Sequence, residues 1–480
     1  MRALVGRTEE QEKLRKYYES KRSEFVALFG RRRVGKTFLV KSLFGDEFAF
    51  YAAGLQDGDT QTQIQNFNKE LAYFGGVGLA PAADWQGAFE NLKQLIDDAP
   101  EEKKKIVFLD EISWMGASHP SFISALDYFW NRWISARDDV LLIVCGSATS
   151  WIIDNIVNNT GGLHNRLTGQ IYLAPLTLKE CETYFRENGI MMSRYNILEA
   201  YMVFGGIPYY LDLFEPGRSL AQNIDRIYFA PGAPLVGEYE NLFKSLFKNA
   251  DNHILVIEAL ATKRKGLSRE EVSRQSGIKG GGTLTKVLSD LVRCGFVREY
   301  LAFGKQSRDR LFQLTDPFTL FHLSFTEKQK RYMENFWLHY CTTPAHSAWS
   351  GYAFELVCLL HVPQIKRKLG ISGVLTEVSS WRSKEGKEAG AGSQIDLVLD
   401  RNDQIINLCE MKYASDTYTI DKEYNKKLRE KRSTFMSETK TRKAAHITMV
   451  TTFGLTQNEY SAEVFFQVTM DDLFLDKQSD

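Results

Sequence analysis

Cysteine is scarce in this chain, and its six cysteines are scattered along the sequence. They form no C-x-x-C pair and no cysteine–histidine group with the spacing of zinc ligands, which argues against a zinc site. Most of them lie in apolar runs, as reduced core thiols of cytoplasmic proteins do. No apolar run approaches the length of a membrane span, and residues 1–7 do not resemble a signal peptide. We therefore expect a cytoplasmic protein with no membrane partner.

A surplus of either charge is also absent, because 60 lysines and arginines balance 60 aspartates and glutamates. Any contact with nucleic acid must then come from local patches. We find no convincing internal repeat and no low-complexity tract. A chain of 480 residues with 44% apolar and 25% charged residues is an ordinary globular protein. Its length predicts about three or four domains.

The most informative stretch lies near the N-terminus, where an apolar strand over 25–29 leads into a glycine-bounded loop and a helix. The loop fits the pattern G-x-x-x-x-G-K-[ST], with Gly30, Arg31, Arg32, Arg33, Val34, Gly35, Lys36 and Thr37 at its eight positions. Backbone N–H groups of such a loop surround phosphate oxygens at a helix N-terminus. Lys36 would reach the β- and γ-phosphates, and the Thr37 hydroxyl would bind Mg²⁺. The context predicts a nucleotide-binding P-loop.

Two further apolar strands end in polar side chains. Residues 106–109 run into Asp110 and Glu111, and residues 141–146 run into Ser147. Strands that alternate with helices in this way predict a doubly wound parallel sheet, which binds ligands at the carboxyl ends of its strands. Asp110 is then the acid of the magnesium site, and Glu111 orients the attacking water. Ser147 contacts the γ-phosphate or the water, although a serine that merely begins a loop fits as well.

Several short stretches together resemble the archaeal-type ATPases, which are AAA+/STAND-related P-loop proteins. They are residues 4–7 (LVGR), 30–37, 108–111 (FLDE), 145–147 (CGS), 166–169 (RLTG) and 205–208 (GGIP). The resemblance covers residues 1 to about 245 and implies ATP as the ligand and its hydrolysis through Asp110 and Glu111. It implies that Arg166 senses the γ-phosphate, in cis or across the interface of a homo-oligomer. From the residues alone, Arg166 fits equally well as a surface arginine. By the same resemblance Gly6 and Arg7 lie near the adenine.

The middle of the chain predicts helices followed by a small mixed segment. Residues 176–245 carry no strand signal and contain a Gly-Gly/Pro break, which predicts a helical lid. Residues 246–325 predict three helices and a hairpin, the pattern of a winged helix. Its basic residues favour modest DNA binding and protein contact about equally; they are Lys279, Lys286, Arg293, Lys305, Arg308 and Arg310. Residues 326–344 predict a helical connector.

The last part of the chain places acids on a predicted hairpin. Asp396 and Glu410 lie on two apolar strands joined by a turn at 400–403, with Lys412 on the same face as Glu410. An even pairing register puts Asp396 on that face as well, and Glu355 on the preceding helix can add a third carboxylate. Inward acids are costly unless they are paired or bind a metal, so this is a candidate Mg²⁺ site that Mn²⁺ would also fit. Lys412 would then stabilise charge or hold the attacking water.

This arrangement resembles the PD-(D/E)XK, restriction-endonuclease-like fold over about residues 345–475. The matching positions are Glu355, Asp396, Glu410 and Lys412, with Gln394 beside them. The resemblance implies a metal-dependent nuclease with Glu355, Asp396 and Glu410 as metal ligands. The short motif also arises by chance on amphipathic strands. A charge-rich helix over 421–443, with nine basic and four acidic residues, offers phosphate contacts.

The sequence as a whole predicts a multi-domain α/β protein. Its five parts are a P-loop ATPase core (1–175), a helical lid (176–245), a winged helix (246–325), a helical connector (326–344) and a nuclease-like domain (345–480). We expect an ATPase coupled to a DNA-binding, Mg²⁺-dependent nuclease. The alternative is a nucleotide-gated DNA- or protein-binding switch with an inactive nuclease-like domain. A GTPase is disfavoured because no N-K-x-D motif is present.

Overall fold

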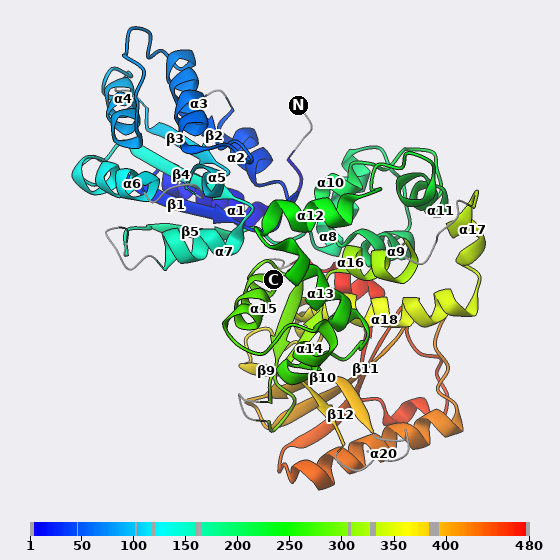
Figure 1. The fold of residues 1–480 in the computed structure, drawn as a ribbon. Helices are drawn as coiled ribbons and strands as arrows, with labels where there is room; N and C mark the ends of the chain where they lie inside the picture. The colour runs from blue at the N-terminus through cyan, green and yellow to red at the C-terminus, as the bar shows by residue number, and fades with distance from the viewer. Residues whose placement is uncertain are drawn as a thin grey trace. The chain divides into compact units, whose positions relative to one another are not determined.

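The computed structural model of the chain describes residues 4–45, 47–100, 103–116, 121–158, 163, 165–305, 309–326, 333–383 and 393–476. The chain forms two compact units, Met1–Pro175 and Leu176–Asp480, which Figure 1 colours from blue to red along the sequence. Each unit has its own sheets and covering helices, so each is described by itself. The five-part division that the sequence suggests stays a prediction.

A parallel sheet forms the centre of the first unit. Its strands lie in the order β2-β3-β4-β1-β5, and every neighbouring pair is parallel. All residues of β1, β3 and β4 are buried, as expected for apolar strands covered on both faces. The bounds are β1 Glu24–Phe29, β2 Phe48–Ala53, β3 Lys105–Asp110, β4 Val140–Gly146 and β5 Gly169–Tyr172.

Helices alternate with these strands and cover the sheet (Figure 1). Asp84 caps α4, because its Oδ1 accepts a hydrogen bond of 2.8 Å from the backbone N–H of Gly87. The apolar face of α4 is buried. The helices are α1 Thr8–Tyr18, α2 Lys36–Phe44, α3 Thr60–Tyr73, α4 Trp85–Asp97, α5 Ile112–Gly116, α6 Ser121–Arg132 and α7 Thr149–Ile152, followed by a π-helical turn η2 Ile153–Val157.

The second unit begins with helices, and the described residues 176–246 contain no strand. The Gly-Gly/Pro break separates α9 from α10. At Gly206 there is no room for a side chain. Its φ is 68°, and a Cβ atom would lie 2.2 Å from the carbonyl oxygen of Leu176. The elements are α8 Leu178–Glu187, α9 Arg194–Phe204, α10 Pro208–Leu211, α11 Leu220–Ile224, η3 Asp225–Phe229 and α12 Glu238–Leu246.

Three helices and a small antiparallel sheet follow, and we call residues 250–314 the helix–hairpin segment. The sheet order is β6-β8-β7. Lys305 and Arg310 flank the tip of the hairpin, and Arg308 lies outside the described residues. The elements are α13 Ala250–Ala261, β6 Leu267–Ser268, α14 Arg269–Ser276, α15 Gly282–Arg293, β7 Val297–Tyr300 and β8 Leu311–Leu314.

An aromatic connector joins this segment to the last part of the chain. It contains α16 Pro317–Phe321, η5 His322–Thr326 and α17 Phe336–Tyr340, while residues 327–332 of the predicted connector helix lie outside the described residues. The Trp337 ring packs against Phe321, Phe325 and Trp349 with ring centroids 5.0–5.7 Å apart. These contacts fix the connector on the next helix, α18 Pro344–Leu360.

A mixed sheet in the order β13-β12-β11-β10-β9 forms the centre of the C-terminal part. The strands β9, β10 and β11 pair antiparallel, whereas β11, β12 and β13 pair parallel. The long helix α20 connects β11 to β12, as a parallel pair requires. The bounds are α19 Val362–Lys368, β9 Thr376–Arg382, β10 Gln394–Arg401, β11 Ile405–Lys412, α20 Lys422–Thr439, β12 Ala444–Thr451, η6 Ser461–Glu463, β13 Phe466–Thr469 and η7 Met470–Phe474.

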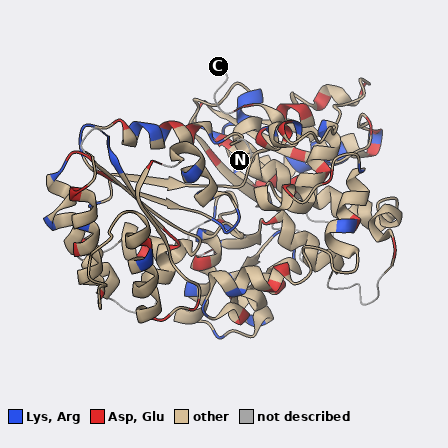
Figure 2. Ribbon diagram, turned by 90° about the horizontal axis from the view of Figure 1, so that it is seen from above, with Lys and Arg blue, Asp and Glu red and all other residues tan. Residues whose placement is uncertain are grey.

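Charged residues of both signs are spread over the helices of each unit, as Figure 2 shows. This distribution agrees with the balanced composition of the chain. Among the described helices, none combines the length and the apolar character that crossing a membrane requires.

Candidate functional site

The loop between β1 and α2 requires glycine at two positions. Gly30 has a φ of 152°, and a Cβ atom there would lie 2.3 Å from the carbonyl oxygen of Leu173, which follows β5. Gly35 has a φ of 92° and directly precedes Lys36, the first residue of α2. Such backbone angles and close approaches are open to glycine and strained for other residues. The strand–loop–helix arrangement predicted for residues 25–37 is therefore confirmed.

Lys36 lies inside the loop with only 5% of its surface exposed. Its Nζ donates hydrogen bonds of 3.0 Å to the carbonyl oxygens of Gly30 and Arg31. It also donates a hydrogen bond of 3.0 Å to Ser147 Oγ, directly after β4. The ammonium group is thus held where the loop meets the carboxyl ends of the central strands.

The end of β3 brings two acids to the same place. The Thr37 hydroxyl donates a hydrogen bond of 2.6 Å to Asp110 Oδ2, and the backbone N–H of Glu111 donates one of 2.9 Å to Asp110 Oδ1. Glu111 has a φ of 45°, in the left-handed region, where the chain leaves the strand abruptly. The hydroxyl of Thr37, the last P-loop residue, is therefore bonded directly to the carboxylate of Asp110.

Ser147 joins the second acid to the lysine. Its hydroxyl donates a hydrogen bond of 2.7 Å to Glu111 Oε1, and its backbone N–H donates one of 3.0 Å to Glu111 Oε2. Since Ser147 Oγ also accepts from Lys36, the chain Lys36–Ser147–Glu111 crosses the ends of β3 and β4. We call Lys36, Thr37, Asp110, Glu111 and Ser147 the nucleotide site.

The β4 residue next to the nucleotide site is shielded from solvent. Cys145 on β4 is fully buried, and burial, reinforced by the nearby Asp110 carboxylate, raises the pKa of its thiol well above the ordinary value. A neutral thiol at this position matches the expectation of reduced core cysteines. In such an environment charges interact more strongly than in water, so the bonded arrangement of Lys36 and the acids is well suited to hold phosphate.

The other predicted loop residues lie at or near these groups. Arg31 is buried, while Arg32 and Arg33 are partly exposed. The Val34 carbonyl oxygen accepts a hydrogen bond of 3.2 Å from Nη2 of Arg7, which is itself buried. Arg7 is therefore fixed on the P-loop, and its role near the adenine stays a prediction.

Arg166 stands in a different situation. It lies in an exposed turn before β5, where its backbone N–H donates a hydrogen bond of 3.1 Å to the carbonyl oxygen of Leu163. The structure gives its side chain no bond to the nucleotide site within the described residues. Its predicted role at the γ-phosphate stays a prediction.

The predicted acids of the C-terminal part lie on one hairpin. The strands β10 and β11 pair antiparallel with Leu397 opposite Cys409 and Val398 opposite Leu408. This is the even register on which the sequence argument for Asp396 depended, and continuing it by one position places Asp396 opposite Glu410. Asp396 also falls where the pairing of β10 with β9 shifts register, between Ile395 and Val398. Both acids therefore lie on one face of the sheet.

Cationic and polar groups hold these two acids. Lys265 Nζ lies 3.4 Å from Asp396 Oδ1, which also accepts a hydrogen bond of 2.6 Å from Gln394 Nε2. Lys431 Nζ on α20 donates a hydrogen bond of 2.7 Å to Glu410 Oε1. The Tyr424 hydroxyl donates one of 3.3 Å to Glu410 Oε2.

Two further predicted residues complete this group. Burial, and then the negative charge of Asp396, raise the pKa of the Glu355 carboxyl to about 7, while Lys265 and Lys412 oppose the rise. Lys412 Nζ lies 5.0 Å from the centre of the Tyr424 ring. We call Glu355, Asp396, Glu410 and Lys412, with Lys265, Lys431 and Tyr424, the carboxylate site.

The carboxylate oxygens of Glu355, Asp396 and Glu410 are the ligand type that a hard divalent cation prefers, although three lysines accompany them. Among the residues that the structure describes, however, no three acids, histidines or cysteines converge as the ligands of one ion. Asp396 and Glu410 instead face the ammonium groups of Lys265 and Lys431. A metal would have to replace these ammonium groups.

Sequence reasoning missed Lys265, Lys431 and Tyr424. Lys265 belongs to the run Lys263-Arg264-Lys265 between a helix and a strand, which is typical of a solvated turn. Lys431 is one of nine basic residues in 421–443, and nothing local distinguishes it from the others. Only tertiary structure brings these residues to the acids.

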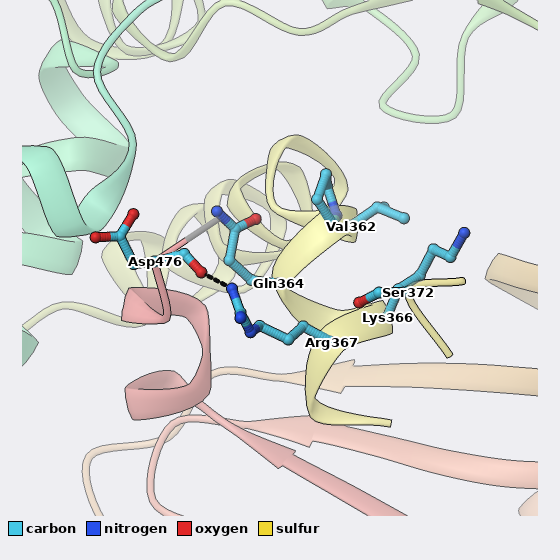
Figure 3. A pocket seen from close by; sticks show the side chains of 7 residues that line it. Val362, Gln364, Lys366, Arg367, Ser372 and Asp476 are labelled. Atoms are coloured by element: carbon cyan, nitrogen blue, oxygen red, sulfur yellow. Dashed lines mark hydrogen bonds between the residues drawn. The ribbon is translucent and has the colours of Figure 1, made fainter. Parts of the chain in front are cut away.

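A separate pocket of about 350 Å³ lies beside α19 and contains no residue of either site (Figure 3). Figure 3 shows Arg367 donating a hydrogen bond to the backbone carbonyl of Asp476 across it. Lys366 donates one of 3.2 Å to the carbonyl oxygen of Val374. The lining residues are Val362, Pro363, Gln364, Lys366, Arg367, Ser372 and Asp476.

Comparison with known proteins finds similarity over the part of the chain that holds the nucleotide site. Residues 4–214 match the model of an ATPase domain found predominantly in Archaea. An uncharacterized protein of Methanocaldococcus jannaschii is 23% identical over 415 residues, which are 85% of this chain and 87% of that protein. This match extends beyond the ATPase domain into the C-terminal part of the chain.

Among solved structures, a Walker-type ATPase of Pyrococcus abyssi is similar, with a TM-score of 0.51 and 17% identity. The match covers 67% of this chain and 96% of that one, and at this identity it shows the fold. The resemblance to archaeal-type ATPases predicted from the sequence is therefore confirmed for the N-terminal part. Residues 4–214 match the model of an ATPase domain of archaeal type, and this match supports ATP binding and ATP hydrolysis by this chain.

Proposed function

We propose that the chain is a magnesium-dependent ATPase coupled to a metal-dependent nuclease that acts on DNA. The observation that carries the ATPase half is the bonded chain Lys36–Ser147–Glu111 beside the Thr37–Asp110 pair. These five residues come from the P-loop and from the carboxyl ends of β3 and β4, where parallel sheets bind ligands.

Each residue of the nucleotide site has a distinct task in this proposal. The backbone N–H groups of residues 31–37 surround the phosphates, and Lys36 leaves its carbonyl partners to reach the β- and γ-phosphates. Thr37 and Asp110 would hold magnesium, which neutralises phosphate charge when bound. Glu111 orients the attacking water, and Ser147 holds the Glu111 carboxylate in place through two hydrogen bonds.

The nuclease half rests on the register of β10 and β11, which supports Asp396 and Glu410 as neighbours on one face. Glu355, Asp396 and Glu410 would hold the metal, which activates water and polarises the phosphodiester when bound. Lys412 would stabilise the charge that develops on the phosphate oxygens. The order of elements from α18 through β9–β11 and α20 to β12 supports the PD-(D/E)XK-like interpretation.

DNA contact would come from local basic groups. Lys279 is exposed in the loop before α15, Lys286 is exposed on α15, and Lys426 and Lys427 are exposed on α20. Part of the charge on α20 is neutralised, since Arg429 Nε lies 3.1 Å from Glu463 Oε1. We therefore expect modest affinity that falls steeply as salt rises.

The test is cleavage of linear, circular and single-stranded DNA with Mg²⁺ or Mn²⁺, in the presence and absence of ATP. We expect wild-type cleavage that responds to ATP and is lost in Lys412→Ala. The matched control is Lys244→Ala, which changes an exposed lysine on α12, outside both sites and outside the proposed DNA contacts, and should cleave normally. Cleavage that persists in Lys412→Ala would reject the nuclease assignment.

One observation favours the second candidate, a nucleotide-gated binding switch with an inactive nuclease-like domain. Asp396 and Glu410 are both engaged by lysines, as acids kept for structure would be. In that case DNA binding would depend on ATP, and no cleavage would occur with either metal. Retained ATPase activity and DNA binding without cleavage would select this candidate.

A further inference from the structure

The turn that joins α13 to β6 lies against the carboxylate site. Two tyrosines fix its backbone. The Tyr352 hydroxyl on α18 donates a hydrogen bond of 2.9 Å to the carbonyl oxygen of Arg264, and the Tyr300 hydroxyl on β7 donates one of 2.7 Å to that of Lys265. Arg264 adds a hydrogen bond of 3.1 Å from Nη1 to the carbonyl oxygen of Ala348. The path of this turn is therefore set by α18, which also carries Glu355.

The hairpin of the same segment is attached on the other side of the site. The backbone N–H of Phe303 donates a hydrogen bond of 2.6 Å to the carbonyl oxygen of Ser380 on β9. The Phe303 ring packs against Phe435 of α20 with centroids 5.0 Å apart. The helix–hairpin segment thus contacts α18, β9 and α20, the elements that surround the carboxylate site.

From this fixed turn the side chain of Lys265 reaches Asp396. Its Nζ lies 3.4 Å from Asp396 Oδ1, with 49% of the Lys265 side chain and 28% of the Asp396 side chain exposed. An ion pair that is this accessible contributes little to stability. Its importance is positional, because the ammonium lies against a carboxylate proposed as a metal ligand.

We propose that Lys265 controls access of the divalent cation to the carboxylate site by competing with it for Asp396. The inference rests on the proposed function, since it takes Asp396 as a metal ligand. A cation that binds Asp396 must displace the Lys265 ammonium or bind beside a positive charge a few ångströms away. Metal affinity therefore depends on a residue outside the nuclease-like domain, in the helix–hairpin segment.

The chain offers a matched control in the same turn. Lys263 lies two positions earlier and pairs with Glu271 at 2.8 Å, so its ammonium is engaged within the helix–hairpin segment. Replacing Lys263 removes the same charge from the same turn without freeing Asp396. Lys265→Arg keeps a cation at the position and serves as the conservative variant.

The experiment is a titration of the full-length protein with Mn²⁺, followed by calorimetry or by the electron paramagnetic resonance signal of the free ion. We expect Lys265→Ala to bind Mn²⁺ about 3- to 10-fold more tightly than the wild type, because one competing charge is gone. Lys263→Ala and Lys265→Arg should keep wild-type affinity, and Asp396→Ala should lose the binding.

The outcomes separate this inference from the proposed function. If Asp396→Ala loses Mn²⁺ binding but Lys265→Ala binds like the wild type or more weakly, the competition is rejected and the metal site stands. An equal gain in Lys263→Ala would also reject it, since the effect would then be general charge removal. If no protein binds Mn²⁺ through Asp396, the metal site and the competition fail together.

Discussion

The nucleotide site has two acids at the end of one strand, β3, and the carboxylate site has two acids on the neighbouring strands β10 and β11. The two sites hold these acids differently. In the nucleotide site, Asp110 and Glu111 are held by hydroxyl and backbone donors of Thr37, Ser147 and Glu111 itself. In the carboxylate site, Asp396 and Glu410 face ammonium groups of Lys265 and Lys431. One set of acids is positioned by neutral groups, and the other is matched by charge.

This difference separates two ways of building a polar site. Neutral donors orient a carboxylate and leave its charge available to a ligand, so the nucleotide site is prepared for magnesium and phosphate. Ammonium partners neutralise a carboxylate and compete with the next cation. We therefore expect substitution of the ammonium partner Lys265 to tune metal binding at the carboxylate site, whereas substitution of Lys36 or Glu111 should disable the nucleotide site.

The largest expected effect is on ATP turnover. Glu111→Gln removes the carboxylate that orients water but keeps the shape of the side chain, so the rate of ATP hydrolysis should fall about 10²- to 10⁴-fold. Nucleotide binding should stay near the wild-type value. A phosphate-release assay and a fluorescent-ATP titration measure the two quantities, with Glu90→Gln on the exposed side of α4 as the control. An unaltered rate of ATP hydrolysis would mean that another residue orients the attacking water.

The next effect is on ATP affinity. Lys36→Ala removes a buried ammonium with three hydrogen bonds, and we expect ATP affinity to drop by roughly 100-fold or more. Lys41→Ala changes an exposed lysine of the same helix and should bind ATP normally. Near-normal ATP affinity of Lys36→Ala in an equilibrium titration would contradict the P-loop assignment.

The third prediction concerns the pH dependence of stability, which a buried histidine of the second unit should control. Burial lowers the pKa of His322 in the second unit to about 4, so the folded protein keeps the ring neutral where an unfolded chain protonates it. Stability is therefore complete above the unfolded pKa of roughly 6.5, and falls as pH drops from there toward 4. Lowering the pH from about 7.5 to about 5 should cost this unit roughly 1–2 kcal/mol through His322.

Calorimetric melting of wild type and His322→Gln at these two pH values measures the effect. The variant should lose part of the acid sensitivity of the second unit, whatever its stability at neutral pH. The remaining sensitivity belongs to other buried histidines, such as His346, whose pKa burial also lowers. Equal pH dependence in the two proteins would show that His322 is protonated without penalty.

The smallest effect concerns the residue after Lys412. The Tyr413 hydroxyl lies 2.9 Å from Glu199 Oε1 and 2.6 Å from the Tyr195 hydroxyl, both on α9, and burial raises the pKa of Glu199. Tyr413→Phe should destabilise the second unit by about 1 kcal/mol, because a buried acid loses a donor. Urea denaturation measures this, with Tyr128→Phe, an exposed ring on α6, as the control. No change in the urea midpoint would mean that water replaces the hydroxyl.

The features that local rules could predict were those whose determinants lie within a few residues. The strand–loop–helix arrangement of the P-loop follows from its glycine positions and the apolar strand before it, and the structure confirms it. Strand alternation put Asp396 beside Glu410 only if the register was even, and β10 and β11 have that register. Strand β5, whose residues alternate between buried and exposed, and the short β13 gave little signal. Lys265 and Lys431 could not be predicted, because a lysine's sequence neighbours do not reveal which distant acid it faces.

The hydrogen bond from Tyr413 to Glu199 of α9 bears on where the ATPase-like part of the chain can be separated from the rest. The stretch that matches the ATPase domain model runs to residue 214, whereas the first compact unit ends at residue 175, so α9 lies inside the matched stretch but folds with the second unit. A cut at residue 214 would separate Tyr195 and Glu199 from the tyrosine that they contact. A fragment made for study should therefore not end at residue 214, because the buried Glu199 would lose its Tyr413 donor.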